Sequence, residues 1–162
     1  QINVLNLLNN TLGSPVSVAA VSGGLPPTFA YVPMSAMACG PAACTPVTLA
    51  VSEAPTVRVI NMTNAARPEV RLSLSSVLTP VNITYSRDGS LLFVFGLVPA
   101  TPAPASPSLT VFNVQTSSFI TQINFEAATN AMTISQDGAY LVLQMEDELL
   151  LIGVPGGEDA VG

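Results

Sequence analysis

The chain has 162 residues and a net charge of −6, and only 9% of its residues are charged although 49% are hydrophobic. All four basic residues are arginine, and histidine, lysine and tryptophan are absent. Four arginines cannot neutralise a run of phosphates, which argues against nucleic acid as a partner. Without histidine, a Ser-His-Asp system and a His-ligated zinc site are excluded. The longest apolar run, Leu91–Val98, is too short for a membrane helix, so no membrane insertion is expected.

Short runs rich in Val, Ile, Leu, Phe and Thr recur between turn residues, and no window keeps a helical period, which predicts an all-β fold. The first run, Ile2–Leu7 (INVLNL), has close copies at Val57–Met62 (VRVINM) and Leu109–Val114 (LTVFNV). A looser copy lies at Leu149–Val154 (LLLIGV). The copies begin 40 to 55 residues apart, which is the spacing of repeated four-stranded sheets.

Two further strands are expected after each of the first three copies. The next strands are predicted at Val16–Val21, Val70–Leu74 and Phe119–Phe125, and those after them at Thr28–Val32, Val81–Ser86 and Ala131–Ser135. Two of the latter lead through an Asp-Gly turn, Ser86–Ser90 or Ser135–Ala139, into apolar runs at Leu91–Phe95 and Tyr140–Leu143. Asp-Gly between two apolar runs is a strong hairpin signal, so two β-hairpins are predicted here.

These repeats resemble the β-propeller blades of the YVTN and WD-repeat type, most specifically over Asn82–Gly96 and Leu109–Leu151. The resemblance implies consecutive antiparallel four-stranded blades, about three of them, in an open arc or in part of a larger ring. The first hairpin has Pro33–Pro46 in place of Asp-Gly, and no copy has a Trp-Asp or Tyr-Val-Thr-Asn signature. The implied division is a partial blade (1–24), two blades (25–77 and 78–127), a partial blade (128–154) and a tail (155–162).

Cys39 and Cys44 bracket the sequence Gly-Pro-Ala-Ala. This spacing favours a small disulfide-closed loop over two free thiols or a metal site, because two thiolates without histidine are too few metal ligands. A disulfide would indicate an oxidising compartment.

Three glycosylation sequons begin at Asn9, Asn61 and Asn82. Asn9 follows the first strand and is the best acceptor, whereas Asn61 and Asn82 lie in or beside strands. A further candidate for modification is a proline-rich segment, which is expected to form an extended polyproline arm outside the sheets. It resembles the Ala-Pro and Ser-Pro glycomodules of plant and green-algal surface glycoproteins, in which proline is hydroxylated and glycosylated; a plain surface loop is the alternative. Its candidate residues are Pro99, Thr101, Pro102, Pro104, Ser106 and Pro107.

Acidic residues give no catalytic or metal site. Asp88 and Asp137 hold equivalent positions in two repeats and are expected to be turn residues. Glu146, Asp147 and Glu148 form a solvated turn in preference to a calcium site, because successive side chains of an extended segment point to opposite faces. We therefore predict no catalytic, metal-binding or cofactor-binding residue.

The leading functional hypothesis is a non-enzymatic structural or protein-interaction module of a secreted or cell-surface glycoprotein assembly. Its partners would be other protein chains or the remaining blades of the same protein, and glycans. The residues expected at the assembly edge are Ile2, Val4, Leu5, Leu149, Leu151 and Ile152. One alternative is a carbohydrate-binding propeller that uses Tyr31, Tyr85 and Tyr140 as platforms. Another is a fragment of a propeller enzyme whose active site lies elsewhere.

Overall fold

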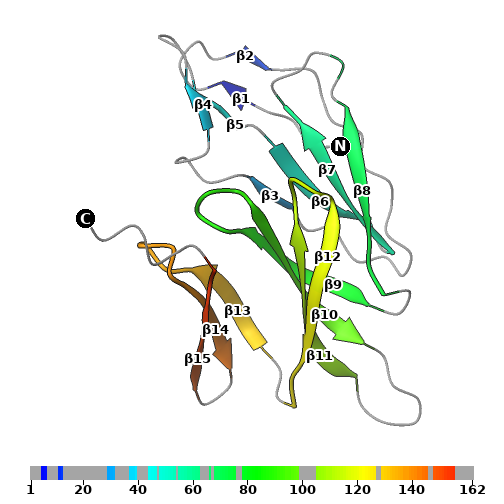
Figure 1. The fold of residues 1–162 in the computed structure, drawn as a ribbon, viewed down its shortest axis with the longest axis vertical. Coiled ribbons are helices and arrows are strands. Elements are labelled where there is room, and N and C mark those ends of the chain that lie inside the picture. Colours follow the sequence, from blue (N-terminus) through cyan, green and yellow to red (C-terminus); the bar gives the residue numbers. More distant parts are fainter. Residues whose placement is uncertain are drawn as a thin grey trace.

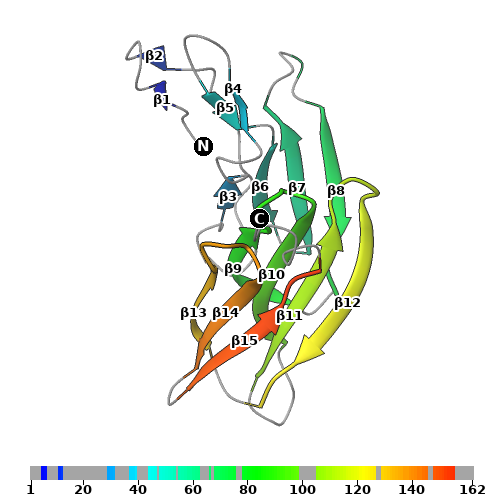
Figure 2. The same ribbon diagram turned by 60° about the vertical axis from the view of Figure 1, so that its left-hand side comes forward.

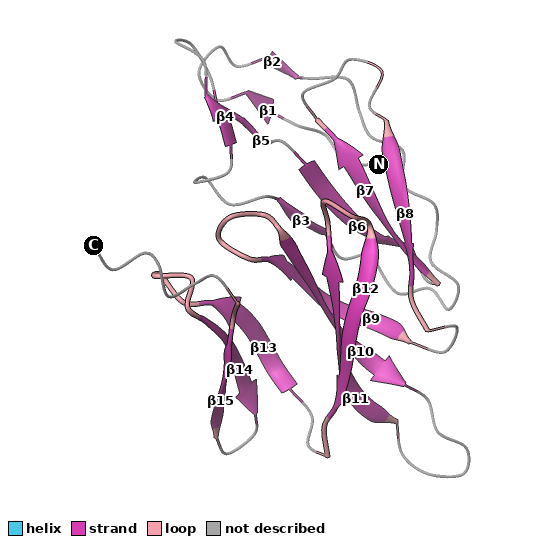
Figure 3. Cartoon of the chain, viewed as in Figure 1, coloured by secondary structure: helices cyan, strands magenta, loops and turns pink. Residues whose placement is uncertain are grey.

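The structure is a computed structural model, and the residues that it describes are all-β. The described residues are 5–6, 11–12, 29–31, 37–39, 44–46, 48–53, 55–62, 66, 68–75, 78–98, 105–126, 129–145 and 148–155. Side chains are described from Thr48 onward, except those of residues 129 and 130. Every regular element within these ranges is a strand (Figure 3), which confirms the predicted all-β class. The same ranges contain no helix with the length and hydrophobicity needed to cross a bilayer.

The first sheet has four antiparallel strands, each paired with the next in the order β3-β6-β7-β8. They are β3 (Phe29–Tyr31), β6 (Thr48–Glu53), β7 (Thr56–Asn61) and β8 (Glu69–Ser73). Between β3 and β6, the chain forms a two-stranded hairpin of β4 (Met37–Cys39) and β5 (Cys44–Pro46). Another short pair, β1 (Leu5–Asn6) and β2 (Thr11–Leu12), precedes β3.

The second and third sheets are antiparallel meanders. The second sheet contains β9 (Thr79–Tyr85), β10 (Leu91–Val98), β11 (Ser106–Asn113) and β12 (Ser118–Asn124). The third contains β13 (Thr129–Ile134), β14 (Tyr140–Met145) and β15 (Leu149–Gly153). The copies beginning at Val57, Leu109 and Leu149 thus form β7, β11 and β15, each the third strand of its sheet.

The predicted Asp-Gly hairpin between β9 and β10 is present, and Ser86 organises it. The Ser86 hydroxyl donates to Asp88 Oδ1 and accepts a hydrogen bond from the Leu91 amide, while the Ser90 amide donates to the same Asp88 oxygen. Gly89 has a φ of 74°, a left-handed conformation that costs glycine little. The hairpin forms here because side-chain oxygens bind amides that the sheet leaves without a partner.

The β13–β14 turn repeats this arrangement. The Ser135 hydroxyl donates to Asp137 Oδ1 and accepts from the Tyr140 amide, and the Ala139 amide donates to Asp137 Oδ1. Gly138 has a φ of 80°. The two turns also meet, because the Arg87 side chain in the first donates to the Gln136 carbonyl oxygen in the second at 2.9 Å.

The second sheet is covered on both faces. Successive side chains of a strand point to opposite faces, so neighbouring residues of one strand enter different cores. On β10, Leu92 and Val94 pack toward the first sheet, in a cluster with Val57, Val59 and Leu72, among others. Phe93 and Phe95 on the same strand pack toward the third sheet, in a cluster with Leu141 and Leu143, among others. The three sheets therefore stack face to face through two cores.

The sheets approach one another most closely at their first strands, because β9 lies beside β3 and beside β13. Figures 1 and 2 show the second sheet, drawn green to yellow, between the first and the third. Consecutive sheets that stack face to face and meet at their first strands form an arc. The described strands do not join into a closed ring.

Part of the proline-rich segment is paired in the sheet, so the prediction that it stands outside is wrong for its last two residues. Ser106 and Pro107 begin β11 and lie opposite Val98 and Leu97 of β10. Proline lacks an amide donor but keeps its carbonyl, and Pro107 accepts a hydrogen bond from the Phe125 amide. Pro107 is the second residue of β11, and it is buried there.

Candidate interaction surfaces

The outer face of the third sheet, which points away from the second sheet, exposes leucines whose counterparts are buried. Leu149 and Leu151 of β15 are 67% and 58% exposed. Their counterparts in the second sheet, Leu109 and Val111, are 0% and 7% exposed because the third sheet covers them. Apolar side chains at the same strand positions thus lie in a core in one sheet and at the surface in the next.

The rest of this outer face is uncharged. Val142 lies opposite Leu151 in the register, Gln144 lies opposite Leu149, and Tyr140 lies opposite Gly153. Tyr140 is 45% exposed, and Val142 is half-buried. On β13, Thr133 pairs with Val142 and so belongs to the same face. We call the set Thr133, Tyr140, Val142, Gln144, Leu149 and Leu151 the outer face.

The predicted edge residues divide between the two faces of β15. Leu149 and Leu151 are exposed, whereas Ile152 is partly buried and packs against the core between the second and third sheets. Ile152 thus packs against the core between the second and third sheets, because successive side chains of a strand point to opposite faces. Leu5 lies in β1 opposite Leu12, and its side chain is not described. Ile2 and Val4 lie outside the described residues.

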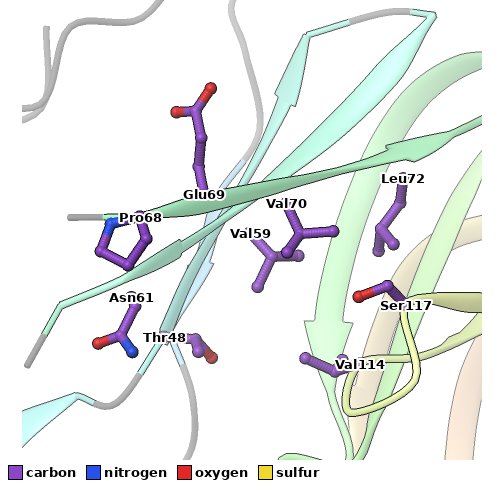
Figure 4. Close-up of a pocket in the computed structure, with 9 residues that line it drawn as sticks. All are labelled: Thr48, Val59, Asn61, Pro68, Glu69, Val70, Leu72, Val114 and Ser117. Atoms are coloured by element: carbon purple, nitrogen blue, oxygen red, sulfur yellow. The ribbon is translucent and has the colours of Figure 1, made fainter.

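An apolar cavity of about 240 Å³ lies between the first sheet and the β11–β12 turn (Figure 4). Its apolar side chains are Val59, Val70, Leu72 and Val114, with Pro68. Polar side chains at the same cavity are Thr48, Asn61, Glu69 and Ser117. Ser117 has a φ of 54°, which is uncommon for a residue other than glycine. The cavity is smaller than most small-molecule sites, which measure about 300–1,000 Å³.

An ion-pair cluster on the first sheet was not predicted from the sequence. Arg58 on β7 lies 2.7 Å from Glu53 Oε1 and 2.7 Å from Glu69 Oε2, and Arg71 lies 3.2 Å from Glu69 Oε1. Burial alone raises the pKa of Glu69, but hydrogen bonds and charges from Arg58 and Arg71 hold it below its usual value. The sequence did contain a signal for this cluster, because Glu69 and Arg71 occupy alternate positions of β8 beside the strand that carries Arg58. The cluster fixes three strands to one another.

The aspartates of the two Asp-Gly turns both have lowered pKa values. Burial raises the pKa of Asp88, but hydrogen bonds from Ser86 and Ser90 bring it below its usual value. The hydrogen bond from Ser135 is the main reason why the pKa of Asp137 is also lowered. Both carboxylates are therefore charged hydrogen-bond acceptors within their own turns, as expected for turn residues. Among the described residues, no group of three Cys, Asp or Glu side chains comes together as metal ligands.

The predicted modification sites are only partly described. Cys39 and Cys44 lie directly opposite each other in the β4–β5 hairpin, and their side chains are not described. Asn61 ends β7 and Asn82 lies within β9, both half-buried, whereas Asn9 lies outside the described residues. Pro99, Thr101, Pro102 and Pro104 also lie outside them.

Two of the three tyrosines considered as carbohydrate platforms have described side chains, and these two lie in different environments. Tyr85 is 1% exposed in the core between the first and second sheets, where its hydroxyl accepts a hydrogen bond from Thr48. Burial raises the pKa of Tyr85 to about 12. Tyr140 lies on the outer face of the third sheet, and Tyr31 is described only by its backbone in β3. Tyr85 is therefore too buried to act as the platform considered for it in the carbohydrate-binding alternative.

Comparison with known protein families and with curated proteins found no match to this chain.

Proposed function

We propose that the chain is a non-enzymatic protein-interaction module, an open arc of propeller-like blades whose last described sheet binds a further β-sheet on its outer face. The observation that carries this proposal is the contrast in exposure between Leu149 and Leu151 and their counterparts Leu109 and Val111. A further sheet packed on the outer face would cover the two leucines as the third sheet covers their counterparts.

Two other observations support this proposal. The outer face has no charged side chain, so a partner sheet could cover it without desolvating an ion. Fully burying a leucine side chain contributes about 1.5–3 kcal/mol, and each of these two is already about one-third covered, so each would add about 1–2 kcal/mol. The first and second sheets also show that this repeat buries the corresponding face of its third strand.

The test is the association state of the 162-residue chain, measured by light scattering and sedimentation over a range of concentrations. Without its natural partner, the exposed outer face should make the chain self-associate as the concentration rises. The double variant Leu149→Ser/Leu151→Ser should remain monomeric. A matched control, Val81→Ser/Ile120→Ser, removes two exposed side chains from the second sheet and should associate as the wild type does. A wild-type chain that is monomeric throughout, or two variants that behave alike, would contradict the proposal.

We also propose that the module is secreted and is part of an extracellular or cell-surface glycoprotein. Support comes from the β4–β5 register, because residues directly opposite in an antiparallel pair have the short Cα separation that a disulfide between Cys39 and Cys44 requires. The sequons and the scarcity of charge agree with such a surface. Alkylation of native protein followed by intact-mass measurement should find both thiols protected until reduction. Two thiols that react before reduction would argue for a reducing compartment.

A further inference from the structure

Among the described residues, the third sheet has three strands, whereas the first and second sheets have four each. In the first two sheets, the third strand is followed by an outer fourth strand, β8 or β12. Among the described residues, no strand pairs with the corresponding edge of β15. This difference concerns the edge of the sheet and is independent of the exposed outer face.

The hydrogen-bond pattern shows which groups this edge presents. The Met145 amide donates to the Glu148 carbonyl, and the Val154 amide donates to the Ala139 carbonyl. Partners in an antiparallel pair alternate between hydrogen-bonded and non-bonded positions. The backbone groups of Leu150 and Ile152 therefore bond to β14, and those of the residues between and after them point away from it. The amides and carbonyls of Leu149, Leu151 and Gly153 thus face the open edge.

The corresponding groups in the other two sheets bind the fourth strand. The Phe125 amide donates to Pro107, which places Leu109 and Val111 in hydrogen-bonded positions opposite Ile123 and Thr121 of β12. In the first sheet, Val57 and Val59 hold the same positions opposite Leu72 and Val70 of β8. In both sheets, the residues opposite are β-branched or leucine.

We infer that the open edge of β15 binds an extended segment of another protein chain, which adds as an antiparallel fourth strand. The segment would pair its backbone with Leu149, Leu151 and Gly153 and would place Val, Ile, Leu or Thr opposite the two leucines. Residues 156–162, Gly-Gly-Glu-Asp-Ala-Val-Gly, lack this alternation, so their composition does not suit the strand. Main-chain pairing would supply affinity, and the alternating side chains would supply specificity.

This inference deepens the proposed function, because it gives the partner a second contact beside the outer face. The edge of β15 also lacks the features that usually prevent strand pairing. Natural edge strands are protected by charge, proline or a bulge, and β15 has none of these over Leu149–Gly153. An unprotected apolar edge is a site where a strand adds.

The test uses proline to block the edge while it leaves the bonds to β14 in place. Gly153→Pro removes an amide that points away from β14, and Gly153→Ala is its matched control because no atom lies within 4 Å of the added Cβ. Leu151→Pro, with Leu151→Ala as control, blocks the central position. The probe is a fluorescent peptide with the sequence of residues 117–126, which includes β12. Its control carries proline at the positions of Thr121 and Ile123.

The wild type and both alanine variants should bind the probe, as fluorescence anisotropy would show, and should not bind the control peptide. Each proline variant should bind about tenfold more weakly or worse, the loss expected for one main-chain hydrogen bond. A probe that does not bind the wild type, or proline variants that bind as their alanine controls do, would overturn the inference. If Leu151→Pro does not fold, Gly153→Pro carries the test. Self-association tests the outer face separately from the edge. If Gly153→Pro self-associates as the wild type does, the proposal for the outer face stands even where peptide binding at the edge fails.

Discussion

The equivalence of the two strands predicts unequal losses of stability for one substitution at two matched leucines. Leu109 and Leu149 begin the apolar part of equivalent strands, but Leu109 is 0% exposed between two sheets and Leu149 is 67% exposed. Replacing a fully buried leucine by alanine costs about 2–5 kcal/mol, since it removes burial and leaves a cavity. For Leu149, about one-third of a burial energy of 1.5–3 kcal/mol is at stake, so Leu149→Ala should cost about 0.5–1 kcal/mol.

Urea unfolding of both variants at a dilution where the chain is monomeric measures this difference. The free energy of unfolding should fall by about 1–4.5 kcal/mol more in Leu109→Ala than in Leu149→Ala, with similar denaturant slopes. Equal losses in the two variants would refute the reasoning, because they would mean that Leu149 is covered in the monomer. A large loss in Leu149→Ala alone would mean that the two strands are not equivalent.

Three further predictions concern the interior and the turns. Gly96→Ala should destabilise the chain by about 1–3 kcal/mol in thermal or urea unfolding, because the added Cβ would collide with the Thr79 carbonyl oxygen. Acid should destabilise the fold through Asp88: its lowered pKa means that its contribution is complete well above pH 3.8, the ordinary value, and is lost as the pH falls through the folded pKa. Asp88→Asn should therefore flatten the dependence of unfolding free energy on pH in that window. In an absorbance titration of the phenols, the Tyr85→Phe variant should lack the component that ionises at about pH 12.

The elements with local chemical signals could be predicted from the sequence. The two Asp-Gly turns are present because serine, aspartate and glycine satisfy the turn by themselves, without help from distant residues. The strand runs around them alternate or are continuously apolar, and the copies at Val57, Leu109 and Leu149 all form third strands. Local signals of this kind do not depend on how the sheets stack.

Features that depend on tertiary contacts could not be predicted in the same way. Pro107 is a poor strand residue by propensity, yet β10 and the Phe125 amide hold it in the second sheet. Ile152 and Leu151 are adjacent and equally apolar, and only the register with β14 decides that the first faces the core. Similarly, Tyr85 is buried because the first sheet covers β9.

The candidate site was partly predicted. The sequence indicated that the terminal strand of the arc would be apolar and open, which named Leu149 and Leu151 but not their exposed face. The alternating charges of β8 hinted at an ion-pair cluster, but the partners of Arg58 and the open backbone of β15 could be identified only from the pairing register. A run such as Leu-Leu-Leu-Ile-Gly does not reveal which of its amides lack a partner.

Residue-specific amide hydrogen exchange is the most direct test of the claim that the third sheet is open. In the dilute monomer, the amides of Leu149, Leu151 and Gly153 should exchange rapidly, while those of Leu109 and Val111 exchange slowly because β12 binds them. Addition of the peptide of residues 117–126 should slow the first group and leave the second unchanged. Protection of Leu149 and Leu151 equal to that of Leu109 and Val111 in the peptide-free monomer would contradict the account, since the edge would then be covered within the chain itself.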